Sequence, residues 1–378
     1  MVECNNCSTH TSYLRSSKEK SLTKIESLPD EVLFEVLVRL PAHDIYDPAR
    51  LVCRKWYHMI HSHTFINAHL QRSTYGLLFH SMFQDSFFMA LGESGRVQIF
   101  ENRYNKLECP IQTSCNGLVL GSQDRTNNSL YVSNPATRQI FNLPPLVGHE
   151  VRYELFAIGY AAASMEYKAV LLLTAKGMKK ICFILTIGVD NSWRTIGKES
   201  VSLASTQIFA SAPLITEGFV HFYHMISNEV LTLNLETEII TETSGPIPEG
   251  EGQGNRWNTY LSTGRYLSLL RPCGEFCWQV WEMQPKIDYR WRMVWDISLE
   301  AHKCSTFQRF GFKESEYLIP IGWLKYPEIL VFGISPFRSQ ILVYNLLTRE
   351  IVTIELPASH SKYKIVVHKE SLLPLGGC

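Results

Sequence analysis

The first apolar pattern along the chain has a helical period. Between Leu28 and Leu40, apolar residues recur every three or four positions, which predicts an amphipathic helix. Pro29 and the two acids that follow it suit the first turn of a helix and the positive end of its dipole. Pro41 cannot continue a helix, so the pattern should end there.

A second helix is predicted directly after the first. Asp47 is the expected cap and Pro48 the expected first helical residue. The apolar residues that follow fall on one helix face: Val52, Trp56, Met59 and Ile60. We place this helical module at residues 25–66. Residues 1–24 are polar and have no apolar period, so we expect a flexible tail.

Beyond Ser73 the hydrophobic period falls to two. Short apolar runs such as 117–120, 130–133 and 340–344 are typical of strands, and turn residues separate them. No strong amphipathic helix interrupts this region. Residues 73–378 are therefore predicted to form an all-β domain.

A degenerate repeat runs through the β region. Asn134, Asn234 and Asn345 each follow an apolar strand and precede a threonine three residues on, at spacings of 100 and 111 residues. An Asn-x-x-Thr sequence suits a hairpin turn, because asparagine bonds to nearby backbone and tolerates unusual dihedral angles. Trp193 and Trp291 fall between these copies, 98 residues apart, and we expect both in blade cores. Two kinds of unit thus alternate, each about 50 residues long, the length of a propeller blade.

These units predict a ring. A single four-stranded sheet cannot bury both of its faces, whereas sheets stacked around an axis can. At this period, residues 73–378 supply about six blades. Closure requires an early strand near 76–79 to pair with a late one near 363–367. An array of two-sheet β-sandwiches is the alternative.

Composition limits the classes of partner that we expect. The 36 basic and 36 acidic residues give a formal net charge of zero, which favours neither nucleic acid nor an anionic membrane as a partner. No apolar stretch approaches the roughly 20 residues that span a bilayer. The ten cysteines are scattered and no secretion signal is visible, so we expect reduced thiols and a location in the cytoplasm or nucleus.

Residues that carry chemistry are sparse. Cys4, Cys7 and His10 supply only half of a zinc site, and we expect neither metal nor cofactor. The glycine-rich segment 250–254 lacks the ending of a phosphate loop. No nucleophile or kinase signature is present, so no catalytic residue is expected. The remaining candidates are a histidine group expected on a solvated helix face (His58, His61, His63, His69) and three acids that a propeller enzyme could use (Glu166, Asp190, Asp288).

The motifs resemble a known family. Leu28-Pro-Asp-Glu-Val-Leu33, Arg39-Leu-Pro41 and Leu51-Val-Cys-Arg-Lys-Trp56 resemble the F-box motif in order and spacing. Ser133-Asn-Pro-Ala-Thr-Arg138 and Leu143-Pro-Pro145 are similar to the F-box-associated and kelch-like propeller domains of plant F-box proteins. Pro48 departs from the F-box pattern, which usually continues a helix at that point.

The resemblance implies the substrate receptor of an SCF-type ubiquitin ligase, a non-catalytic subunit. The F-box would bind the Skp-family adaptor, which links to a cullin and a RING protein, and the propeller would hold an unknown target protein. The implied adaptor contacts are Leu28, Pro29, Val32, Leu33, Val36, Leu37, Leu40, Pro41, Val52, Cys53 and Trp56.

The residues alone point the same way. A helical unit of roughly 40 residues buries too little surface to be stable without a partner, and surplus apolar residues on it indicate an interface. Alternatively, these side chains pack under the β domain. Two other functions stay open: a Skp-bound scaffold without a degradation target, and a propeller enzyme with a helical cap.

Overall fold

The computed structural model describes most of the chain from Leu28 to Leu375. The described residues are 28–81, 86–92, 95–100, 111–122, 129–146, 154–174, 180–201, 212–223, 228–246, 258–284, 289–302, 316–335, 339–357 and 363–375. The predicted tail 1–24, with Cys4, Cys7 and His10, lies outside them. So do Asp288 and the glycine-rich segment 250–254.

The N-terminal module is helical, as predicted. It comprises α1 (Asp30–Leu37), α2 (Ala42–Tyr46), the 3-10 helix η2 (Ala49–Leu51), α3 (Arg54–Ile60) and α4 (His63–Arg72). The carbonyl of Pro29 accepts the amide of Leu33 at 3.0 Å, so the proline stands where α1 begins. Ser62 caps α4 by accepting the amide of Phe65 at 3.3 Å.

The second predicted helix differs from expectation. Asp47 is the C-cap of the short helix α2 rather than the N-cap of a new helix, and Pro48 precedes the 3-10 turn η2. Cys53 is extended, with φ −160° and ψ 170°, and separates η2 from α3. The predicted helix face is therefore interrupted, because Val52 lies before the break and the other three apolar residues belong to α3.

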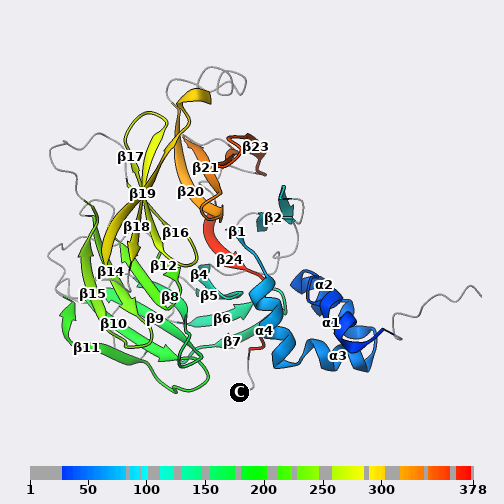
Figure 1. The fold of residues 1–378 in the computed structure, drawn as a ribbon. Coiled ribbons are helices and arrows are strands. Elements are labelled where there is room, and N and C mark those ends of the chain that lie inside the picture. The colour runs from blue at the N-terminus through cyan, green and yellow to red at the C-terminus, as the bar shows by residue number, and fades with distance from the viewer. Residues whose placement is uncertain are drawn as a thin grey trace, which may run out of the picture.

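The β domain is a six-bladed propeller, with one four-stranded antiparallel sheet per blade (Figure 1). Blade 1 contains β1 (Tyr75–His80), β2 (Phe87–Leu91), β3 (Val97–Phe100) and β24 (Lys364–Lys369). Blade 2 contains β4 (Ile111–Cys115), β5 (Leu118–Ser122), β6 (Leu130–Asn134) and β7 (Gln139–Asn142). Blade 3 contains β8 (Glu154–Ala161), β9 (Glu166–Thr174), β10 (Lys180–Thr186) and β11 (Arg194–Val201).

The remaining three blades follow in chain order. Blade 4 contains β12 (Leu214–Thr216), β13 (Phe219–Tyr223), β14 (Glu229–Asn234) and β15 (Ile240–Ser244). Blade 5 contains β16 (Thr259–Ser262), β17 (Leu267–Pro272), β18 (Cys277–Gln284) and β19 (Arg290–Ser298). Blade 6 contains β20 (Tyr317–Lys325), β21 (Ile329–Ser335), β22 (Gln340–Asn345) and β23 (Ile351–Glu355).

The ring closes through the predicted pair of strands. β24 pairs antiparallel with β1 and is the innermost strand of blade 1, so the C-terminal part of the chain completes the first blade. Leu77 lies opposite Val367, and Phe79 lies opposite Ile365. This topology excludes the β-sandwich array.

The Asn-x-x-Thr repeats form hairpin turns, as predicted, in blades 2, 4 and 6. Asn234 Oδ1 accepts the amides of Glu236 and Thr237 at 2.9 and 3.2 Å, and Asn345 makes the same pair of bonds. The unusual dihedral angle falls elsewhere than expected. It lies on the residue after the threonine, where φ is 57°, 56° and 63° in the three copies.

Apolar clusters fill the joins between neighbouring blades. Trp193 and Trp291 were expected in blade cores, but both are only half-buried. Trp193 directly precedes β11, the outermost strand of blade 3, and Trp291 lies in β19, the outermost strand of blade 5. Each packs against the cluster shared with the preceding blade, and Trp193 donates its indole N–H to the Pro144 carbonyl at 2.7 Å. They join blades and do not form blade cores.

None of the helices in the described part of the chain is long and apolar enough to cross a membrane.

Candidate functional site

The helical module has a core of its own. Leu33 and Leu37 on α1 are each only 1% exposed, and they pack in one cluster with Ile45 of α2 and Phe65 of α4. Phe34 meets Phe65 edge-on at a ring-centroid distance of 5.2 Å. Two predicted adaptor contacts, Leu33 and Leu37, therefore lie inside the module, where they support its surface without forming it.

Other apolar residues of the module face outward. Val32, Val36 and Leu40 lie along α1 and just beyond it, at 46, 51 and 36% exposed. Leu51 and Val52, before α3, are 74 and 52% exposed. Lys55 holds the start of α3 against the start of α1, since its ammonium pairs with Asp30 and donates to the Leu28 carbonyl. We call Val32, Val36, Leu40, Leu51 and Val52 the exposed apolar surface.

The other predicted contact residues have mixed positions. Pro29 is exposed, whereas Leu28, Pro41, Cys53 and Trp56 are half-buried. Trp56 packs against the module core, and its indole nitrogen is buried with no hydrogen-bond partner among the described residues. Leu51 is the most exposed apolar residue of the module, but the predicted contacts omit it. The sequence could have indicated Leu51 as a contact, because it stands beside Val52 in the Leu51–Trp56 motif.

The module rests on blade 2. Ala136, in the β6–β7 turn, belongs to the module's apolar cluster, as does Leu372 after β24. Arg138 donates to the Asp47 carboxylate at 2.6 Å across this contact. Part of the module is thus covered by the β domain, as one alternative proposed, yet the exposed apolar surface is left uncovered.

The histidine group does not form one solvated face. His58, His61 and His63 are exposed, as expected. His69 corrects the expectation, because it is 3% exposed and its Nε2 lies 3.0 Å from the Leu40 carbonyl. Burial lowers the pKa of His69 and favours its neutral form. It is a structural residue that fixes the end of α4 against the segment after α1.

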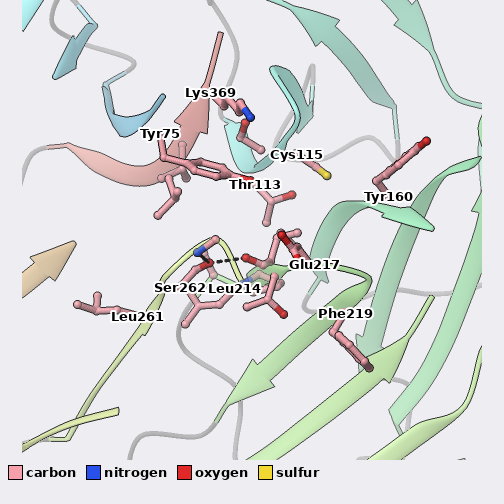
Figure 2. Close-up of a pocket in the computed structure, with 18 of the residues that line it drawn as sticks. Tyr75, Thr113, Cys115, Tyr160, Leu214, Glu217, Phe219, Leu261, Ser262 and Lys369 are labelled. Carbon is pink, nitrogen blue, oxygen red and sulfur yellow. Dashed lines mark hydrogen bonds between the residues drawn. The ribbon is translucent and has the colours of Figure 1, made fainter. Parts of the chain in front are cut away.

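A cavity of 660 Å³ lies at one end of the central channel. The innermost strands β4, β12, β16 and β24 contribute to its wall (Figure 2). Some lining residues lie in the turns that directly follow innermost strands. Asn116 follows β4, and Glu217 follows β12. In an antiparallel blade these turns lie at the same end as the β6–β7 turn, so the cavity is on the side of the propeller that carries the helical module.

Glu166 and Asp190, the two acids considered for catalysis that the structure describes, do not line this cavity. Glu166 lies 3.8 Å from the Lys168 ammonium, and Asp190 accepts from Arg194 and from the amide of Thr186. These bonds outweigh burial and lower the pKa of Asp190. Among the described residues, no three metal-ligating side chains gather to form a metal site. Cys273 and Cys277 occupy the β17–β18 connection and the start of β18.

Comparison with protein families agrees with this architecture. Residues 25–69 match the F-box-like family, and residues 66–238 match the F-box associated beta propeller domain. The propeller match is to this F-box-associated type, so the finer likeness to kelch repeats stays a prediction.

Similar curated proteins come from Arabidopsis thaliana. F-box protein At5g49610 is 25% identical over 73% of this chain and 80% of its own length. F-box protein At3g07870 is 26% identical over 61% of this chain and 63% of its own length. A solved structure of a protein of unknown function from Bacteroides caccae matches 78% of this chain and 99% of its own, at 10% identity and a TM-score of 0.38.

A helical F-box with its own core is thus followed by a six-bladed propeller whose first half matches the F-box-associated domain. The chain belongs to the plant F-box proteins that carry a C-terminal β-propeller.

Proposed function

We propose that this chain is the substrate-recognition subunit of an SCF-type ubiquitin ligase. The F-box binds a Skp-family adaptor, through which the chain is linked to a cullin and a RING protein. The propeller binds a target protein. In this role the chain is a non-catalytic receptor.

The exposed apolar surface is the observation that supports this proposal. Its five side chains are 36 to 74% exposed although the module beneath them has a filled core. Burying apolar surface is worth about 25 cal/mol per Å², so a partner that covers these side chains gains binding energy. Charged pairs such as Glu35 with Arg72, at 2.9 Å, supply a polar rim, as is common at protein interfaces.

Adaptor capture tests the proposal. The double variant Val36→Glu with Leu51→Glu places two charges on the exposed apolar surface, at two of its most exposed residues. We expect its affinity for a co-expressed Skp adaptor to fall at least about a hundredfold, because both charges would be desolvated in the complex. Affinity is measured by titrating adaptor against purified full-length protein, and circular dichroism checks the fold.

The matched control is Ile239→Glu, at a residue that is 60% exposed on the β14–β15 connection of the propeller. This variant adds one glutamate to blade 4, outside the F-box, and should bind the adaptor like the wild type. Equal adaptor binding by the wild type and the double variant would contradict the proposal.

Target turnover separates a ligase receptor from a scaffold. Cells that carry the double variant should keep proteins bound to the propeller for longer than cells with the wild-type chain, since those proteins would no longer reach the ligase. Unchanged half-lives of all bound proteins would favour the scaffold function instead.

A further inference from the structure

The channel cavity has the size of a small-molecule site. Its 660 Å³ falls within the roughly 300–1,000 Å³ of pockets that enclose small ligands. Strands contribute much of its wall. The shape of the cavity is therefore fixed by the strand pairing within each blade and by the arrangement of the blades around the axis. The adaptor-binding proposal does not use this cavity.

Aromatic and aliphatic side chains line the space. Tyr75 enters from the start of β1 and Tyr160 from β8, while Leu214, Phe219 and Leu261 lie along the blade 4 and blade 5 side (Figure 2). Aromatic walls favour a flat apolar body, because offset and edge-on ring contacts add to the gain from burial.

One cation is placed at this wall. Lys369 ends β24, and its ammonium lies 5.1 Å from the centre of the Tyr75 ring. It makes no ion pair within 4 Å among the described residues. Burial lowers the pKa of Lys369, and the carboxylate of Glu217 partly offsets that effect from across the cavity. A partly buried ammonium without a contacting anion gains from binding one.

The other polar residues limit which anion fits. The described lining contains no arginine, so a single ammonium must hold the anion, which favours one negative charge over the two of a phosphate monoester. Two carboxylates also belong to this described lining. Glu236 accepts the amide of Ala163, whereas Glu217 stands opposite at the β12–β13 turn and repels a second negative charge. A ligand with one negative charge and an apolar aromatic body matches the single ammonium and the aromatic wall.

We propose that the channel cavity binds a small aromatic carboxylate, with its ring against Tyr75 and its carboxylate at the Lys369 ammonium. Glu217 faces the ligand from the opposite side and excludes dianions. The site is independent of the exposed apolar surface, so either can be present without the other.

A pair of probes tests the charge requirement. Full-length protein is titrated with 3-phenylpropionate and with the neutral 3-phenylpropionamide, and binding is followed by ligand-observed NMR up to millimolar concentrations. The acid should bind about tenfold more tightly than the amide, because only the acid pairs with the ammonium. Equal binding of the two probes, or no binding of either, overturns the proposal.

Two variants locate the carboxylate. Lys369→Met keeps the aliphatic stem and should remove the preference for the acid. Lys325→Met loses the same charge from an exposed residue that does not line the cavity, and should keep that preference. Unchanged preference in Lys369→Met would overturn the assignment.

Glu217→Gln provides a test at an exposed position, where a fold defect is not expected. Removing this negative charge should strengthen 3-phenylpropionate binding about two- to fivefold and leave the amide unchanged. Weaker binding of the acid would contradict the placement. Adaptor capture, measured in parallel, reports on the F-box alone, so failure of one proposal is distinguishable from failure of the other.

Discussion

His221, in β13, shows how the propeller uses an ionisable side chain as part of its core. Its side chain is fully buried, and its two ring nitrogens lie 2.8 and 3.0 Å from the hydroxyls of Thr216 and Thr232. A neutral imidazole has one donor and one acceptor, and a hydroxyl can serve either, so both nitrogens are satisfied without charge. Burial lowers the pKa of His221 to about 3.

The lowered pKa of His221 predicts a pH dependence of stability. Between its folded value of about 3 and its ordinary value of 6.5, the unfolded chain binds more protons. The contribution of His221 is therefore complete above pH 6.5 and is lost as pH falls, by up to about 1.4 kcal/mol per pH unit. His221→Gln does not titrate. We expect its unfolding free energy, measured in urea from pH 8 to pH 5, to decline less steeply than that of the wild type, and parallel pH profiles would refute this.

The Asn-x-x-Thr turn shows how one local sequence acquires different roles at the scale of elements. Asn345 uses its side-chain oxygen for the turn alone among the bonds described. Asn134 bonds to its own turn through the amide of Ala136, and its side-chain nitrogen also donates to the carbonyls of Ser371 and Leu373, at 3.1 and 2.8 Å. Asn134 thus anchors the segment after β24 on blade 2.

Alanine substitution should separate these two roles. Asn345→Ala loses turn bonds at a half-buried site, and we expect it to cost about 1 kcal/mol. Asn134→Ala also leaves two carbonyls of the C-terminal segment without their donor at a fully buried site, so we expect about 2–4 kcal/mol. Urea unfolding of the two variants measures the difference. Equal costs would show that the bonds to the C-terminal segment add nothing.

The helices of the F-box show what a periodic apolar pattern can predict and what it cannot. The period located α1, because periodicity is a local property, but it did not give the end of the helix. α1 ends at Leu37, and Pro41 caps the next helix, α2, instead of ending the first. The period also did not separate Leu33 and Leu37 from Val32 and Val36, since all four lie on one broad apolar face. Packing of α2 and α4 against one side of α1 made that division.

Closure of the ring is the main property at the scale of the whole molecule. β24 and β1 are far apart in sequence, and their antiparallel pairing joins the last part of the chain to the first blade. Val366 of β24 is 7% exposed and packs in a cluster with Leu78 of β1 and Val119 of β5. This strand therefore contacts both its own blade and the next one.

A charge in the closing strand should destabilise the whole propeller. Val366→Asp buries an unpaired carboxylate, and we expect a loss of about 3–5 kcal/mol in the free energy of unfolding. Val352→Asp, on the outermost strand of blade 6 at 53% exposed, makes the same change at the rim and should cost less than about 1 kcal/mol. Urea denaturation compares the two. Similar losses would argue against β24 as the closing strand.

The amino-acid sequence by itself determined the helical start, the strand period, the Asn-x-x-Thr turns and the pair of strands that closes the ring. These follow from short-range preferences and from a repeat that recurs along the chain. Only the tertiary structure decided which apolar residues of α1 are exposed, that Trp193 joins two blades, that Asn134 holds the C-terminal segment, and that Tyr75, Glu217 and Lys369 share a cavity. Each depends on what packs against a residue from distant parts of the chain, and no local pattern carries that information.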